Sequence, residues 1–144
     1  MTINIEEIYA FLAEVGAVKK SKFHPESDFV KELGIEGDDF SEIIECFAEK
    51  YGVDMRKYRW YFHHGEEGWN LGALFIKPPY AQVQRIAVTP SILLQAAITK
   101  KWPQSHPEHK IVEGRPDITL NNILFVSPVV IGILVWAAYK FGII

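Results

Sequence analysis

Leu33-Gly34-Ile35-Glu36-Gly37-Asp38-Asp39-Phe40-Ser41-Glu42 is the most informative segment of the sequence. Its glycines mark a turn that runs directly into an amphipathic helix. Asp39 and Glu42 form a capping pattern, because carboxylates stabilise the positive N-terminal end of a helix. The apolar residues that follow recur at helical spacing and end before Gly52: Phe40, Ile43, Ile44, Phe47 and Tyr51. The stretch therefore predicts the strongest helix of the domain, with one continuous buried face.

The polar side of this predicted helix is acidic. Its carboxylates are Asp38, Asp39, Glu42, Glu45 and Glu49, and residues 1–54 as a whole carry 13 acidic and 5 basic residues. Such a surface repels phosphate groups and attracts basic protein surfaces. We therefore expect these five residues to bind a protein partner with a basic surface, and we expect no binding of nucleic acid. The alternative is an acidic face that only keeps the helix solvated.

Shorter elements complete the predicted domain. Asn4, followed three residues later by Glu7, predicts the start of a first helix near Ile5. Thr89-Pro90 predicts the start of a last helix, because Thr is a good N-cap and Pro fits the first helical position. The runs at 73–76 and 83–88 predict a small β-hairpin or an extended loop. The fold class is mainly α, a small helical bundle.

The glycine-containing turn and the amphipathic helix that follows it resemble the second helix of an acyl carrier protein. They are also similar to a bacterial acyl-carrier-like family, domain of unknown function 1493. The family's recurring features stand here as Leu33–Asp39, Phe47–Met55, Tyr61-Phe62 and Thr89–Trp102. The resemblance implies an acyl-carrier-like bundle over residues 1–103, with the docking style of a carrier.

Acyl carriers attach phosphopantetheine to the Ser of an Asp-Ser-Leu motif at the start of this helix. When Tyr51-Gly52 is aligned with the carriers' Phe-Gly, Gly37 stands at the position of that Ser. The resemblance thus implies that the attachment hydroxyl is missing, and we expect no cofactor.

Other residues could carry chemistry of their own. Ser41 lies a full turn beyond the attachment position, and Cys46 lies next to the buried stripe, where a thiol packs as a small hydrophobe. His63-His64 precede Glu66 and Glu67, but consecutive histidines rarely point the same way. We therefore expect no catalytic or metal-binding residue and a non-enzymatic interaction module. The alternative is an atypical acyl carrier, an accessory protein of acyl metabolism, or a small enzyme that uses Ser41, Cys46 or the histidines.

The C-terminal segment predicts a membrane anchor. Residues 123–144 hold one charge, Lys140, and as a helix they would be ~33 Å long against a hydrocarbon core of ~30 Å. Lysines and an arginine precede the segment, which by the positive-inside bias places the domain on the cytoplasmic side of the inner membrane. We expect a tail-anchored protein with a polar linker at 104–119 and an anchor at 120–144. A buried or oligomer-forming tail is the alternative, and Pro128 leaves the start of the helix open.

Overall fold

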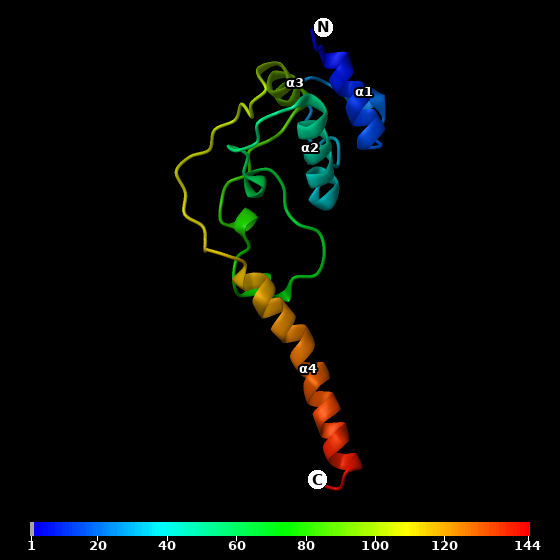
Figure 1. Cartoon of the computed structure of the whole chain (residues 1–144), viewed down its shortest axis with the longest axis vertical. Coiled ribbons are helices and arrows are strands. Elements are labelled where there is room, and N and C mark those ends of the chain that lie inside the picture. The colour runs from blue at the N-terminus through cyan, green and yellow to red at the C-terminus, as the bar shows by residue number, and fades with distance from the viewer. Residues whose placement is uncertain (1) are drawn as a thin grey trace. The chain divides into compact units, whose positions relative to one another are not determined.

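The computed structural model describes residues 2–144, and they form two compact units (Figure 1). The first unit contains the chain up to Glu67 together with Val83–His109. The second contains Gly68–Gln82 together with Lys110–Ile144. This division by contacts differs from the predicted boundaries at residues 103 and 119, because residues 68–82 pack with the C-terminal helix.

The first unit holds helices α1 (Ile5–Val15), α2 (Gly37–Tyr51) and α3 (Pro90–Thr99). The predicted caps are present at α1 and α3, where the side chain of Asn4 accepts the Glu7 N–H and that of Thr89 accepts the Ile92 N–H. Short 3₁₀ turns η1 (Lys20–Lys22) and η2 (Trp60–Phe62) lie between the helices. The mainly helical class is confirmed.

The helices bury one continuous core, which the central apolar face of α2 shares with α1, α3 and the loops. Its buried members are Ile8, Phe11, Leu12, Phe23, Phe29, Leu33, Ile35, Phe40, Ile43, Ile44, Phe47, Val53, Val88, Leu93, Ala96, Ala97 and Trp102. Four of the five residues predicted for the face of α2 are fully buried, and Tyr51 is half-buried. Gly52 then ends α2 in the left-handed conformation, at φ 63°, which favours glycine.

The structure corrects the predicted start of α2. The helix begins at Gly37, two residues before Asp39, and its N-cap is Glu36, whose side chain makes no capping hydrogen bond. Asp39 and Glu42 therefore lie within the first turns and do not form a capping box. Asp38 and Asp39 still lie in the first turn, where a negative charge interacts favourably with the helix dipole.

The structure also decides between the two alternatives for residues 73–88. This part of the chain forms 3₁₀ turns η3 (Leu71–Leu74) and η4 (Pro79–Ala81) joined by loops, and no named strand occurs among the described residues. One isolated bridge pairs Asp54 with Lys101. Of the two alternatives, the loop is the one that forms, because residues 71–74 and 79–81 fold into 3₁₀ turns and so do not extend as paired strands.

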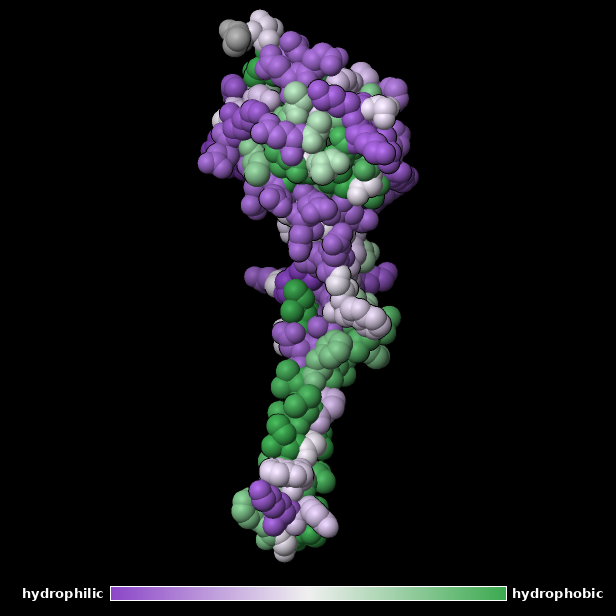
Figure 2. Space-filling view, turned by 90° about the vertical axis from the view of Figure 1, so that its right-hand side faces the viewer, coloured by the Kyte–Doolittle hydropathy of each residue, from purple (hydrophilic) through white to green (hydrophobic). Residues whose placement is uncertain are grey.

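The second unit contains α4 (Pro116–Lys140) and the η3 turn that packs against it. Helix α4 runs through Pro128 and begins at Pro116, before residue 120, where the predicted anchor starts. It is the one helix of the described chain that is long and apolar enough to cross a membrane, and none of its most apolar stretch is buried. Figure 2 shows that most of the visible surface of this helix is apolar, with paler residues in between and a hydrophilic group near its C-terminal end.

Candidate functional site

The N-terminal end of α2 is built around Gly37. This residue has a φ of 58°, which an L side chain rarely adopts, and the side chain of Glu67 lies directly over it. A Cβ atom at Gly37 would stand 2.3 Å from Cγ of Glu67, so Glu67 would have to move. A side chain at this position would therefore be strained and would displace Glu67.

The acidic face of α2 is free. The side chains of Asp38, Asp39, Glu42, Glu45 and Glu49 are all exposed. None of them forms an ion pair within the part of the chain that the structure describes. Their charge is thus available to a partner, and like charges on neighbouring turns reinforce one another in attracting cations.

On the adjoining side of α2, the structure brings Ser41 together with His64. His64 Nδ1 lies 2.6 Å from the carbonyl oxygen of Gly65, which can only accept, so Nδ1 carries the proton. The unprotonated Nε2 then accepts a hydrogen bond from the hydroxyl of Ser41, 3.4 Å away. Phe40 stacks on the imidazole with ring centroids 4.6 Å apart, and burial lowers the pKa of His64. The neutral ring therefore ties the loop after η2 to α2.

The Ser41–His64 pair has the residue types of a nucleophile and its base, but its position limits its chemistry. Ser41 lies inside α2, where the backbone N–H groups are used by carbonyls one turn earlier. Acyl transfer needs free donors beside the nucleophile to stabilise the oxyanion. The pair consequently works as a structural hydrogen bond.

A groove of about 350 Å³ runs along α2 next to Ser41. Its walls are Ser41, Ile44, Glu45, Ala48, Met55, Tyr58, Arg59 and Trp60. Apolar side chains of α2 and of the following loop line the groove, together with the exposed, charged Glu45 and Arg59. Its size lies at the low end for small-molecule pockets, and its lining suits an apolar group.

The predicted cluster at residues 63–67 does not stay together. His63 is fully buried and donates from Nδ1 to the carbonyl of Ile86, 3.0 Å away, whereas His64 turns toward Ser41. Glu66 is exposed and Glu67 covers Gly37. Among the described residues, no group of three or more His, Cys, Asp or Glu side chains is placed to hold a metal ion. Cys46 is half-buried against the core.

Sequence reasoning missed a buried polar cluster beside His63. The rings of Tyr58 and Trp102 contact the imidazole of His63, at centroid distances of 5.1 and 5.6 Å. Several buried polar atoms of this region lack a hydrogen-bond partner in the described structure: Tyr58 Oη, His63 Nε2, Trp102 Nε1, Gln104 Oε1 and His106 Nε2. Burial lowers the pKa of His63 to about 4, so the ring is neutral at pH 7. The density of aromatic residues around His63 was the one available signal.

Residues 106 and 109, predicted to lie in a linker, also belong to the first unit. His106 stacks on Phe62 with centroids 4.7 Å apart, and His109 Nε2 lies 2.8 Å from the hydroxyl of Tyr61. This part of the chain is therefore held on the domain.

The chain is similar to acyl carrier proteins. Over 50 residues it is 40% identical to the acyl carrier protein of Helicobacter pylori strain G27, and equally to those of strains HPAG1 and ATCC 700392 / 26695. The match covers 35% of this chain and 64% of the carriers, so the chain spans less than two thirds of their length. No family model matches the chain. No solved structure matches it either. With the helical fold, the similarity supports an acyl-carrier-like domain.

Proposed function

We propose that the protein is a non-enzymatic, acyl-carrier-like interaction module that is tethered to the cytoplasmic membrane. It binds a partner protein with a basic surface through Asp38, Asp39, Glu42, Glu45 and Glu49. The proposal includes membership of the acyl-carrier-like family known as domain of unknown function 1493. The domain faces the cytoplasm, and α4 crosses the bilayer once.

The observation that carries the proposal is the N-terminal half of α2. The exposed carboxylates Asp38, Asp39 and Glu42, which form no ion pair within the described residues, follow a helix start at which Gly37 offers no hydroxyl. A side chain at Gly37 would be strained by the left-handed backbone and would have to displace Glu67, so the position does not favour a modified side chain. A carrier-like helix with its docking charges but without an attachment point supports a role in binding rather than in carrying an acyl group.

The membrane tether is supported by α4. Its 25 residues make a helix ~37 Å long, which exceeds the hydrocarbon core of ~30 Å, and its most apolar stretch is unburied. Leu134 is 63% exposed and Ile133 is 58% exposed. Contiguous apolar surface of this extent is unfavourable in water and favourable in lipid.

A capture experiment tests the docking surface. The full chain, with benzophenone placed at the exposed Lys50 of α2, is solubilised from membranes and cross-linked, and the captured proteins are compared with those of the variant Glu42→Lys/Glu45→Lys/Glu49→Lys. The control variant Glu14→Lys/Glu26→Lys/Glu32→Lys makes the same charge change at exposed sites outside α2. We expect the α2 variant to lose the partner and the control to keep it. Equal loss or equal retention in both variants would contradict docking through α2.

An atypical acyl carrier is the second candidate, and the groove beside Ser41 favours it because its apolar lining suits an acyl chain. Ser41 is then the hydroxyl that could be modified. Expression with a phosphopantetheinyl transferase, followed by measurement of the intact mass, distinguishes the two. A mass increase equal to the prosthetic group, lost in Ser41→Ala, would establish the carrier and overturn our proposal.

A further inference from the structure

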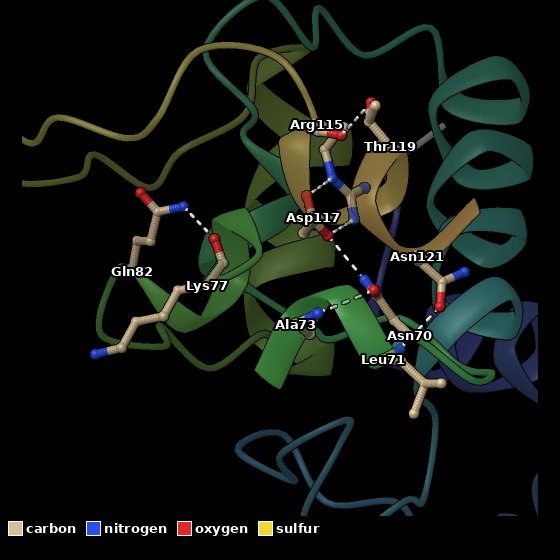
Figure 3. A network of polar contacts seen from close by, with 9 residues as sticks. All are labelled: Asn70, Leu71, Ala73, Lys77, Gln82, Arg115, Asp117, Thr119 and Asn121. Atoms are coloured by element: carbon tan, nitrogen blue, oxygen red, sulfur yellow. Dashed lines mark hydrogen bonds and ion pairs between the residues drawn. The ribbon is translucent and has the colours of Figure 1, made fainter. Parts of the chain in front are cut away.

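The loop Gly68–Gln82 is fastened to the first turns of α4 by polar contacts (Figure 3). Asn70 Nδ2 donates to Asp117 Oδ2 at 2.8 Å, and the Leu71 N–H donates to Asn121 Oδ1 at 2.8 Å. Asp117 is 1% exposed and also accepts from Arg115 at 2.7 Å. A buried carboxylate that is paired in this way holds the loop in one position, since separating the partners would leave the charge unsatisfied.

Gly72 allows the loop to approach the helix this closely. A Cβ atom at Gly72 would stand 1.9 Å from the carbonyl oxygen of Asp117, which is backbone and cannot give way. Gly72 is itself buried. The η3 turn thus packs backbone against backbone on α4, and the loop behaves as part of the helix end.

Although its backbone is fastened, the loop exposes its largest apolar side chains. Trp69 is 84% exposed, Leu74 is 78% exposed and Phe75 is 74% exposed. They flank the packed residues Asn70 to Ala73 on both sides. Exposing apolar side chains on a held loop costs free energy in water, so they indicate a contact that is completed elsewhere.

The apolar helix α4, which begins next to this loop, indicates what covers the exposed side chains of the loop. From Asp117 to Tyr139 the rise of α4 is ~33 Å, close to the thickness of the hydrocarbon core. At the far end, Trp136, Tyr139 and Lys140 form an interfacial group, with Lys140 Nζ 4.9 Å from the Trp136 ring. Aromatic residues are enriched at both membrane–water interfaces. Trp69 supplies such a ring at the near end, where the first turns of α4 contain no Trp or Tyr, and Phe75 adds a further exposed apolar ring.

We propose that residues 68–82 form a membrane-interface collar. The side chains of Trp69, Leu74 and Phe75 insert into the headgroup and upper acyl region of the bilayer at the point where α4 enters it. The collar fixes the depth of the helix and anchors its near end as Trp136 and Lys140 anchor the far end. This inference rests on the proposed tether, and it assigns lipid, rather than a protein, to the exposed face of the loop.

Depth-dependent quenching tests the collar on the full chain. Cys46→Ser removes the native thiol, and single cysteines at Phe75→Cys, Leu74→Cys, Val130→Cys or Gln84→Cys carry the fluorophore NBD. Each protein is reconstituted into vesicles of phosphatidylcholine and phosphatidylglycerol that contain a lipid quencher at either a shallow or a deep position. We expect strong loss of emission with the shallow quencher at 74 and 75, with the deep quencher at 130, and with neither at 84.

The outcomes separate the two proposals. Loss at 130 without loss at 74 and 75 would overturn the collar while the tether stands. Absence of loss at 130 would overturn the tether, and the collar with it. A blue-shifted emission at 74 and 75 that no lipid quencher reduces would show that protein covers the loop, which also overturns the collar.

The substitution Gly72→Leu provides a second measurement, because it separates the loop from α4 without changing the exposed side chains. Gly132→Ala is its matched control, since a Cβ at Gly132 contacts nothing within 4 Å. We expect Gly72→Leu to shift the quenching profile at 75 away from the shallow quencher and Gly132→Ala to leave the profile unchanged. An unchanged profile in Gly72→Leu would mean that the docked loop does not set the depth.

Discussion

Helices α2 and α4 are both rich in apolar residues, but α2 buries these residues whereas α4 leaves them exposed. In α2 the apolar residues repeat on one face, and Phe40 and Phe47 are fully buried, while the carboxylates occupy the other face. In α4 the apolar residues surround the helix, and Val130 and Leu134 remain largely exposed. Periodicity, rather than apolar content, thus separates a helix that packs into the protein core from one whose apolar surface stays unburied in the chain.

The comparison is tested most severely by truncating one buried and one exposed apolar side chain. Phe47→Ala should lower the free energy of unfolding of the domain by about 3–5 kcal/mol, because it leaves a cavity in the core. Leu134→Ala should leave the free energy of unfolding unchanged. Urea denaturation of the full chain in detergent micelles, followed by near-UV circular dichroism, measures both. Equal effects of the two substitutions would show that the apolar faces are misassigned.

A charge in α4 tests the same contrast from the other side. Ile133→Arg should oppose insertion by about 2.5–3.5 kcal/mol on the translocon scale and so reduce the membrane-bound fraction. Replacing exposed Glu49 with Arg should leave that fraction as it is. Alkaline extraction of membranes and immunoblotting measure the fraction. Full retention of Ile133→Arg would place α4 outside the hydrocarbon core.

The pH dependence of the domain tests the burial of His63. The pKa of His63 is about 4 in the folded state and 6.5 for an unperturbed histidine, so the unfolded state binds more protons between these values. The stabilisation by neutral His63 is present above pH 6.5 and is lost as the pH falls toward 4. From pH 7 to pH 5 the loss should be about 2 kcal/mol.

Two histidine variants test whether His63 is the group responsible for this pH dependence. His63→Asn keeps a donor toward the Ile86 carbonyl but cannot titrate, and it should reduce the pH dependence of the unfolding free energy, part of which remains because burial also lowers the pKa of His64. His24→Asn, at an exposed site, should leave the dependence intact. A wild-type slope that survives in His63→Asn would assign the pH dependence to another group.

The smallest effect on stability concerns the polar face of α2. Reversing Glu42, Glu45 and Glu49 together should hardly move the thermal unfolding midpoint, because the three side chains are exposed and make no ion pair in the described structure. Differential scanning calorimetry at low and high salt measures the midpoint. A large shift would mean that this face contributes to folding and is not reserved for a partner.

Much of the first unit could be predicted from the sequence, because its signals are local. The apolar repeat from Phe40 to Tyr51 and the caps at Asn4 and Thr89 each depend on residues within one or two turns. The start of α2 was misplaced since Gly37 enters the helix in a left-handed conformation, which the carboxylate pattern does not reveal.

The rest depends on contacts between distant segments. His64 meets Ser41 across 23 residues, and Asn70 meets Asp117 across 47, so no local pattern could predict either contact. Nothing in the spacing around Gly72 indicates that α4 would lie against it. The free carboxylates of α2 were correctly expected to be exposed, whereas the position of Glu67 over Gly37 required the structure.

Flotation on a density gradient tests the central claim, that the chain is a folded domain held on a membrane by α4. The full chain and a chain lacking residues 123–144, which keeps Asp117 and Asn121 for the η3 loop, are mixed with vesicles and centrifuged. We expect the full chain to float with the lipid, and the shortened chain to stay in the aqueous fraction with its helical circular dichroism intact. A full chain that remains soluble and monomeric without lipid or detergent, or a shortened chain that unfolds, would contradict this account.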